Sequence, residues 1–255
     1  MEYAHHRIYA YIFTIIMHTG NLIYLAIFVE PHIKMDQDLI ILKKLQPRLF
    51  TIWTLMIQMF YAFVCLIIDL RELKNRENKK YKLSKYFRGF RDTLFASVLW
   101  PACWVVIIVF WSLSLYDKAL IFQKNTDKFL NPISNHILHT AIMPLAVWEI
   151  MYRYRTQPRT HRKYFYNTVF FFALYFVVIT YTYFERGIWI YPIFAKFYGT
   201  IYFPLIYTVI SGIAISAYFL QWPLTDYFWR ERRTLKKKRK RYKIGYTVYV
   251  YVLCF

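Results

Sequence analysis

Six long apolar segments, separated by clusters of charged residues, constrain this sequence more than any other feature. Each segment is close to the roughly 20 residues that an α-helix needs to cross the hydrocarbon core of a bilayer. Only 19% of the residues are charged, whereas about 25% is usual in soluble domains. We therefore expect an all-α, polytopic membrane protein with six transmembrane helices, over residues 8–29, 49–70, 93–115, 131–151, 166–185 and 199–221.

The Lys and Arg residues between these segments predict the orientation of the chain. If alternate connections lie on the same side of the membrane, one side carries 25 Lys and Arg residues and the other carries 9. Cytoplasmic connections carry the excess of positive charge in membrane proteins. Both termini should then be cytosolic, with a transmembrane domain over residues 1–229 and a basic cytosolic tail over residues 230–255.

The net charge of +20 does not require a nucleic acid partner, because the basic residues lie next to the predicted membrane ends. The tail contains the run Lys236–Arg241, and each such residue contributes about 1 kcal/mol of attraction near an anionic leaflet. We expect the tail to lie on anionic lipids, either as a simple positive-inside anchor or through a specific phosphoinositide. The length of the segments suits the plasma membrane and the endoplasmic reticulum equally.

The fourth apolar segment holds two histidines, His136 and His139, in a run of 20 residues without Asp, Glu, Lys or Arg. Ionisable side chains inside a membrane segment are costly and mark functional sites by default. The two histidines are three residues apart and therefore share a helix face. They can serve as metal ligands, as hydrogen-bond partners of neighbouring helices, or as a general base. No third metal ligand lies nearby in the sequence, and we expect neither a metal nor another cofactor.

A general base needs a nucleophile on the same side of the membrane. With both termini cytosolic, the second and fourth segments each begin at the non-cytosolic face, and Thr51 lies in the first turn of the second segment. At 1.5 Å per residue, His139 should lie about 10–12 Å deep and Thr51 about 3 Å deep. Composition and periodicity do not choose between Thr51 and the other hydroxyls of this kind, which are Thr54, Thr140, Thr168, Thr180 and Thr182.

The sequence lacks the motifs of common soluble enzymes, such as a Gly-x-Ser-x-Gly elbow or a phosphate-binding glycine loop. From the residues alone, a multi-pass scaffold without catalytic activity and a small transporter both remain alternatives to an enzyme. The near absence of charge inside the segments argues against a transporter, which needs polar groups along its path.

A set of motifs, in this order and spacing, resembles a known family. They are Phe50-Thr51, Leu55-Met56-Ile57-Gln58, Val64-Cys65-Leu66, Asp69-Leu70, Arg91-Asp92, Phe110-Trp111, Tyr116-Asp117, Asn135-His136-x-x-His139-Thr140 with Pro144, and Gly187-x-Trp189-x-Tyr191-Pro192. The chain resembles the androgen-induced-gene protein and androgen-dependent TFPI-regulating protein family over most of residues 1–229. It departs from the family in its long basic connection 71–91 and in the tail after Trp229.

The resemblance implies a hydrolase that cleaves fatty acid esters of hydroxy fatty acids. Its catalytic pair, a threonine of the second span and a histidine of the fourth, falls by motif position on Thr51 and His139. In this mechanism His139 is the general base, and the apolar substrate reaches the site from within the bilayer. The supporting or substrate-binding residues are predicted to be His136, Asn135, Trp53 and Tyr191.

Overall fold

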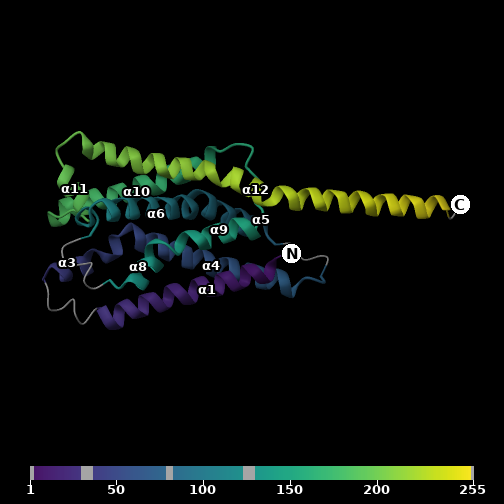
Figure 1. The fold of residues 1–255 in the computed structure, drawn as a ribbon, viewed down its shortest axis with the longest axis horizontal. Coiled ribbons are helices and arrows are strands. Elements are labelled where there is room, and N and C mark those ends of the chain that lie inside the picture. The colour runs from purple at the N-terminus through teal and green to yellow at the C-terminus, as the bar shows by residue number, and fades with distance from the viewer. Residues whose placement is uncertain (1–2, 30–36, 79–82, 123–129, 254–255) are drawn as a thin grey trace.

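The structure is a computed structural model that describes residues 3–29, 37–78, 83–122 and 130–253. These residues form helices and their connections, without a β-strand among them. Long helices run side by side along one axis, and the short helices α3, α8 and α11 lie toward one end of the bundle (Figure 1). The prediction of an all-α fold is therefore confirmed.

Five helices of the described residues are long and apolar enough to cross a membrane. Two of them contain or end in a π-helical segment, η1 (Leu25–Val29) and η3 (Phe95–Leu99). The first candidate span, Ala4–Ile27, consists of α1 (Ala4–Tyr24) and the start of η1, and the second is α4 (Phe50–Lys74). The third, Lys85–Tyr116, consists of α5 (Lys85–Leu94), η3 and α6 (Trp100–Tyr116). The fourth is α10 (Arg162–Arg186), and the fifth, Tyr202–Glu231, is the first part of α12 (Tyr202–Leu253).

The fourth predicted segment is not one continuous helix. It forms two shorter helices, α8 (Pro132–His139) and α9 (Ile142–Tyr152), separated at Thr140 and Ala141. Pro144 explains the break, because proline has no N–H to donate to the carbonyl four residues earlier, which here is that of Thr140. The carbonyl of Thr140 instead accepts from the N–H of Met143 at 3.1 Å.

Large apolar side chains point outward around the bundle. Phe170 is 70% exposed, Val177 62% and Phe63 55%, all in the middle of long apolar helices. Soluble monomers rarely expose large apolar patches, and the exposure of these side chains fits contact with lipid. Together with the five long helices, it identifies the chain as an integral membrane protein.

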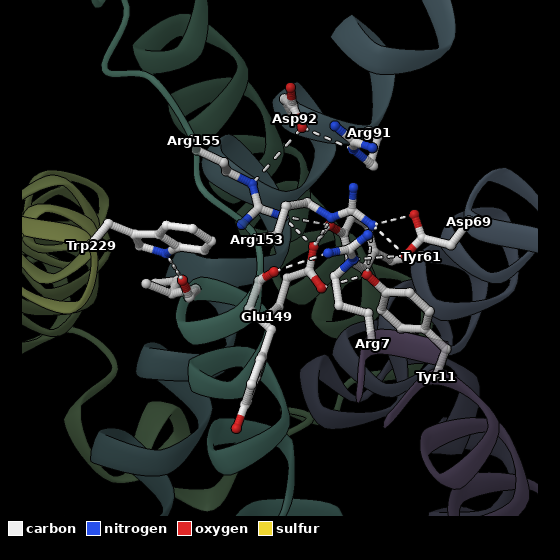
Figure 2. Close-up of polar contacts among 12 residues, drawn as sticks. Arg7, Tyr11, Tyr61, Asp69, Arg91, Asp92, Glu149, Arg153, Arg155 and Trp229 are labelled. Atoms are coloured by element: carbon white, nitrogen blue, oxygen red, sulfur yellow. Dashed lines mark hydrogen bonds and ion pairs between the residues drawn. The ribbon is translucent and has the colours of Figure 1, made fainter. Parts of the chain in front are cut away.

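A cluster of buried charged and phenolic side chains joins the helices at the end of the bundle where the N-terminus lies (Figures 1 and 2). Glu149 of α9 accepts hydrogen bonds from Tyr11, Tyr61, Arg153 and Arg155 at 2.6–2.8 Å. Arg153 also bonds Asp69 of α4 at 2.8 Å, and Arg7 of α1 bonds the same carboxylate at 2.7 Å. The cluster therefore links α1, α4 and α9 with the segment that follows α9.

The opposite charges of this cluster compensate each other. Burial alone lowers the pKa of the Arg153 guanidinium, but the neighbouring carboxylates of Glu149 and Asp69 hold it well above the usual value. Removing one partner of such a buried pair typically costs about 3–5 kcal/mol.

The N-terminus and the tail leave the bundle at this same end (Figure 1). Near it, the ring of Tyr3 lies 6.2 Å from that of Trp229 in α12. Helix α12 continues beyond residue 229 without a break and projects from the bundle. The division into a domain and a tail at that residue stays a prediction, as does the cytosolic location of this end.

Candidate active site

The bundle contains a partly open cavity of about 640 Å³ toward the end opposite to the charged cluster. Its wall is mostly aliphatic and aromatic, and it includes parts of α4, α6, α8, α10, α11 and α12. Pockets for small molecules usually measure about 300–1,000 Å³ and have few polar groups in an apolar wall. The polar or hydroxyl-bearing residues of the wall are Lys43, Gln46, Thr51, Ser112, His139, Tyr175, Tyr191 and Tyr202.

Thr51 lies in the first turn of α4, which begins at Phe50. The first N–H groups of an α-helix have no partner inside the helix. Here the N–H of Phe50 donates to the hydroxyl of Tyr191 at 2.9 Å, and that of Trp53 donates to the carbonyl of Leu49. The amides of Thr51 and Ile52 bond no other described residue, and both residues line the cavity.

The hydroxyl of Thr51 differs from those of the other candidate threonines. Within the described part of the chain it makes no hydrogen bond, and it lies in the cavity wall. The other five threonines are outside the wall and already bonded. Thr54, Thr168, Thr180 and Thr182 donate to the carbonyl four residues earlier, and Thr140 bonds Trp111 and His136. Among these six, Thr51 is thus the hydroxyl available for chemistry in the cavity.

His139 is the last residue of α8, and it is buried with only 7% of its surface exposed. Its Nδ1 lies 2.8 Å from the side-chain oxygen of Asn135 and 3.0 Å from the backbone oxygen of the same residue. A carbonyl oxygen only accepts, so Nδ1 carries the proton and Nε2 keeps its lone pair. No described residue bonds Nε2. A histidine in this tautomer is prepared to accept a proton.

The ring of His139 is also fixed by stacking. It lies parallel to the ring of Phe110 in α6, with centroids 3.4 Å apart and an angle of 4° between the planes. Two contacts therefore set its orientation, the hydrogen bonds of Nδ1 and the face of Phe110. Thr51 and His139 both belong to the wall of this cavity.

The other predicted site residues have different positions. Tyr191 lines the cavity, and its hydroxyl lies 3.1 Å from that of Tyr175, which in turn donates to the carbonyl of Arg48. His136 is exposed, stacks on Trp111 and bonds Thr140, while Trp53 donates to the carbonyl of Pro47. Neither His136 nor Trp53 belongs to the cavity wall. The roles of all these residues stay predictions.

By their positions in the sequence, four residues are candidates for orienting His139: Glu30, Asp117 and Glu185, which should lie near the same membrane face, and the nearby Asn135. Asp117 caps the short helix η4 (Lys118–Leu120), and Glu185 pairs with Arg48 at 2.6 Å. Glu30 lies outside the described residues. Of the three candidates that the structure describes, Asn135 is the one that bonds His139. Asn135 and His139 are four residues apart, which is about one helical turn, and this spacing in the sequence already favours a contact between them.

These features define an integral membrane protein with an internal, mostly apolar cavity whose wall combines an unbonded hydroxyl and an oriented imidazole. The profile of the family described as FAR-17a/AIG1-like protein matches residues 13–224, and the chain belongs to this family.

Individual relatives agree with this assignment. The chain is 33% identical to the androgen-dependent TFPI-regulating protein of Homo sapiens over 194 residues, which are 74% of this chain and 80% of the relative. It is 31% identical to the protein of that name from Mus musculus over 64% of this chain and 70% of the relative. Similarity to the androgen-induced gene 1 protein of Homo sapiens is 23% identity over 77% of this chain and 83% of the relative. No solved structure matches the chain.

Proposed function

We propose that this protein is an intramembrane hydrolase of lipid esters, with Thr51 as nucleophile and His139 as general base. The observation that carries the proposal is that both residues line one apolar cavity, with an unbonded hydroxyl on Thr51 and an unbonded Nε2 on His139. The family resemblance supplies the substrate class, fatty acid esters of hydroxy fatty acids. An apolar wall suits long acyl chains and excludes most polar metabolites.

The chemistry follows from these two groups. His139 Nε2 takes the proton of the Thr51 hydroxyl as Thr51 Oγ1 attacks the ester carbonyl carbon. The ester bond then breaks, and the leaving alkoxide receives the proton from His139, so that an alcohol departs and an acyl-threonine remains. Water attacks this second ester, gives one proton to His139, and releases the fatty acid as Thr51 recovers its hydroxyl proton.

The carbonyl oxygen becomes negatively charged during each attack and needs hydrogen-bond donors. The amides of Thr51 and Ile52 are suitable, because they stand at the start of α4, bond no other described residue and belong to residues of the cavity wall. The N-terminus of a helix carries partial positive charge and stabilises an anion. Asn135 is assigned the positioning role, since it holds the Nδ1 proton of His139.

The arrangement in the membrane completes the proposal. We assign α8 and α9 together to a sixth crossing, so that both termini lie in the cytosol and the cavity end of the bundle faces away from it. The basic tail then meets the anionic lipids of the cytosolic leaflet. The host membrane is the plasma membrane or the endoplasmic reticulum.

The test is turnover of a fatty acid ester of a hydroxy fatty acid by the purified protein in lipid nanodiscs. His139→Ala should lower kcat by about 10²- to 10⁴-fold, the usual contribution of general-base catalysis, and Thr51→Ala should lower it at least as much, because it removes the nucleophile itself. Mass spectrometry of a quenched reaction should find the acyl group on the peptide that contains Thr51.

Two variants serve as controls for a loss of activity that comes from a disturbed fold. Ser112→Ala removes the other aliphatic hydroxyl of the described cavity wall, and Thr54→Ala removes a threonine of the same helix that only bonds a backbone carbonyl. Both should retain activity within a few fold. Normal turnover by folded Thr51→Ala would disprove the catalytic pair. Absence of turnover in the wild type, with flux or partner binding in its place, would favour a transporter or a scaffold.

A further inference from the structure

The first candidate span contains a buried histidine, His18, that the proposed chemistry does not use. It lies on the inner face of α1, and none of its surface is exposed. Its Nε2 lies 2.8 Å from the side-chain oxygen of Gln58 in α4, which is also buried. An ionisable side chain inside a membrane span is costly and marks a functional role by default. His18 lies outside the described wall of the cavity, so it does not contact a substrate bound there.

Gln58 extends this contact to the start of α9. Its side-chain nitrogen donates to the backbone oxygen of Ile142, the first residue of that helix, at 2.9 Å. This bond fixes the orientation of the Gln58 amide, because a carbonyl oxygen only accepts. The amide oxygen of Gln58 therefore faces His18, and the ring of His18 donates from Nε2. His18, Gln58 and Ile142 thus form one buried chain of hydrogen bonds through α1, α4 and α9.

A second pair of buried side chains joins α1 to α8. Asn21, three residues after His18 on the same buried face of α1, accepts a hydrogen bond from the hydroxyl of Ser134. The two sets of contacts therefore hold the two parts of the broken fourth segment, α8 at Ser134 and α9 at Ile142. His139 lies between these two points, five residues after Ser134 and three before Ile142.

We propose that His18 and Gln58 are positioning residues that hold His139 in the wall of the cavity. This inference rests on the proposed function, in which His139 is the general base. A break in a helix lets the two parts change their relative angle, and Pro144 removes one of the bonds that would oppose this change. The bond from Gln58 fixes α9 at its first residue, directly beyond the break. His139, the last residue of α8, then keeps its place in the wall.

A hydrogen-bonding role fits His18 better than proton transfer. Its Nε2 meets the amide of Gln58, which is a neutral group and does not take up a proton near neutral pH. A neutral donor is therefore sufficient for this contact. His18→Gln should preserve the contact, because glutamine also carries an N–H donor, whereas His18→Leu leaves the buried oxygen of Gln58 without this partner.

The test measures hydrolysis by variants in lipid nanodiscs, together with the thermal unfolding of each variant. Gln58→Leu should lower kcat about 10- to 100-fold with little change in KM, since a misplacement of about 1 Å at a catalytic centre can cost about 10²-fold. His18→Leu should lower kcat only about fivefold, the effect of one lost hydrogen bond, because the bond from Gln58 to Ile142 is not removed. His18→Gln should recover most of the wild-type kcat.

Thr14→Val is the matched control for these variants. Thr14 is buried on the same face of α1, but its hydroxyl donates to the carbonyl of Ala10 in its own helix. Its kcat should therefore stay within about twofold of the wild type. A loss in Thr14→Val equal to that in Gln58→Leu would overturn the proposal, because any change on this face of α1 would then disturb the site.

Two further outcomes would contradict the positioning role. An unchanged kcat in folded Gln58→Leu would show that the bond to Ile142 does not affect the base. Equal loss in His18→Gln and His18→Leu would indicate that His18 transfers protons. This second comparison also decides the matter if Gln58→Leu does not fold, since both His18 variants keep the bond to α9.

Nuclear magnetic resonance of nitrogen-15-labelled histidines tests the inference without catalysis. The side-chain signals of His139, identified by their absence in His139→Ala, should show a proton on Nδ1 in the wild type. Gln58→Leu should shift or broaden these signals, and Thr14→Val should leave them in place. Unchanged signals of His139 in folded Gln58→Leu would overturn the positioning role, whether or not an ester is hydrolysed. Shifted signals in a protein without turnover would support this role and refute only the proposed function.

Discussion

Replacement of Asn135 by leucine tests the orientation of His139 directly. The Nδ1 proton of His139 has two acceptors, the side-chain oxygen of Asn135 at 2.8 Å and the backbone oxygen of the same residue at 3.0 Å. Asn135→Leu removes only the first. The backbone oxygen still accepts the proton, so Nε2 should remain unprotonated and able to act as a base.

The expected loss is therefore that of one hydrogen bond, about 1 kcal/mol, which corresponds to about a fivefold decrease in kcat. This is far smaller than the loss of about 10²- to 10⁴-fold expected for His139→Ala, which removes the base itself. Because Asn135 positions His139 and does not contact the substrate, KM should change little.

The assay is steady-state hydrolysis in nanodiscs, with thermal unfolding of each variant to verify its fold. Asn135→Asp keeps an acceptor at the same position, and its kcat should stay closer to that of the wild type than the kcat of Asn135→Leu. A loss in Asn135→Leu as large as that in His139→Ala would refute the idea that the backbone oxygen fixes the tautomer. An unchanged kcat would show that the side chain has no positioning role.

Three further predictions concern stability and topology. Glu149→Gln should destabilise the protein by about 3–5 kcal/mol, since it leaves buried Arg153 and Arg155 undercompensated, and thermal unfolding should show a large decrease in Tm. Glu185→Gln is its control, because the partly exposed pair with Arg48 contributes only about 0–1 kcal/mol, and equal shifts in Tm would contradict the argument. Replacement of Lys236–Arg241 by glutamine should release a fluorescent label at the tail from nanodiscs that contain phosphatidylserine, with no change in neutral ones. A cysteine introduced at Lys44 should react with an impermeant thiol reagent added outside intact cells, and cytosolic labelling would refute the predicted orientation.

The long apolar segments and the distribution of charge were sufficient to predict a helical membrane protein. This works because every backbone group inside a bilayer must be satisfied within its own segment, which leaves helices as the natural solution for such runs. The sequence also predicted where five of the six helices lie, with errors of at most 4 residues at most ends, but of 8 residues at the start of the third segment and 10 at the end of the sixth. It missed the break between α8 and α9, although Pro144 was visible, because a proline inside a membrane helix often only bends it.

No local sequence pattern shows which residues share the wall of the cavity. Thr51 and His139 are 88 residues apart, and only the packing of the bundle brings both into one cavity wall. The choice of Thr51 over the other five threonines likewise follows from the hydrogen bonds that those threonines already make. Family resemblance named the pair, but only the structure shows that Asn135 and Phe110 contact the ring of His139.

The sequence by itself thus determined that the chain inserts into a membrane and that its apolar segments are helical, because hydrophobicity and segment length are local properties. The tertiary structure decided which polar side chains form hydrogen bonds or ion pairs between helices and which face the cavity. Arg7, Asp69 and Glu149 illustrate the difference, since they come from three distant segments and compensate each other only when the bundle is assembled. Because these side chains are buried, each charge would destabilise the fold if its partners were absent. The assembled bundle, not the sequence pattern, therefore defines their role.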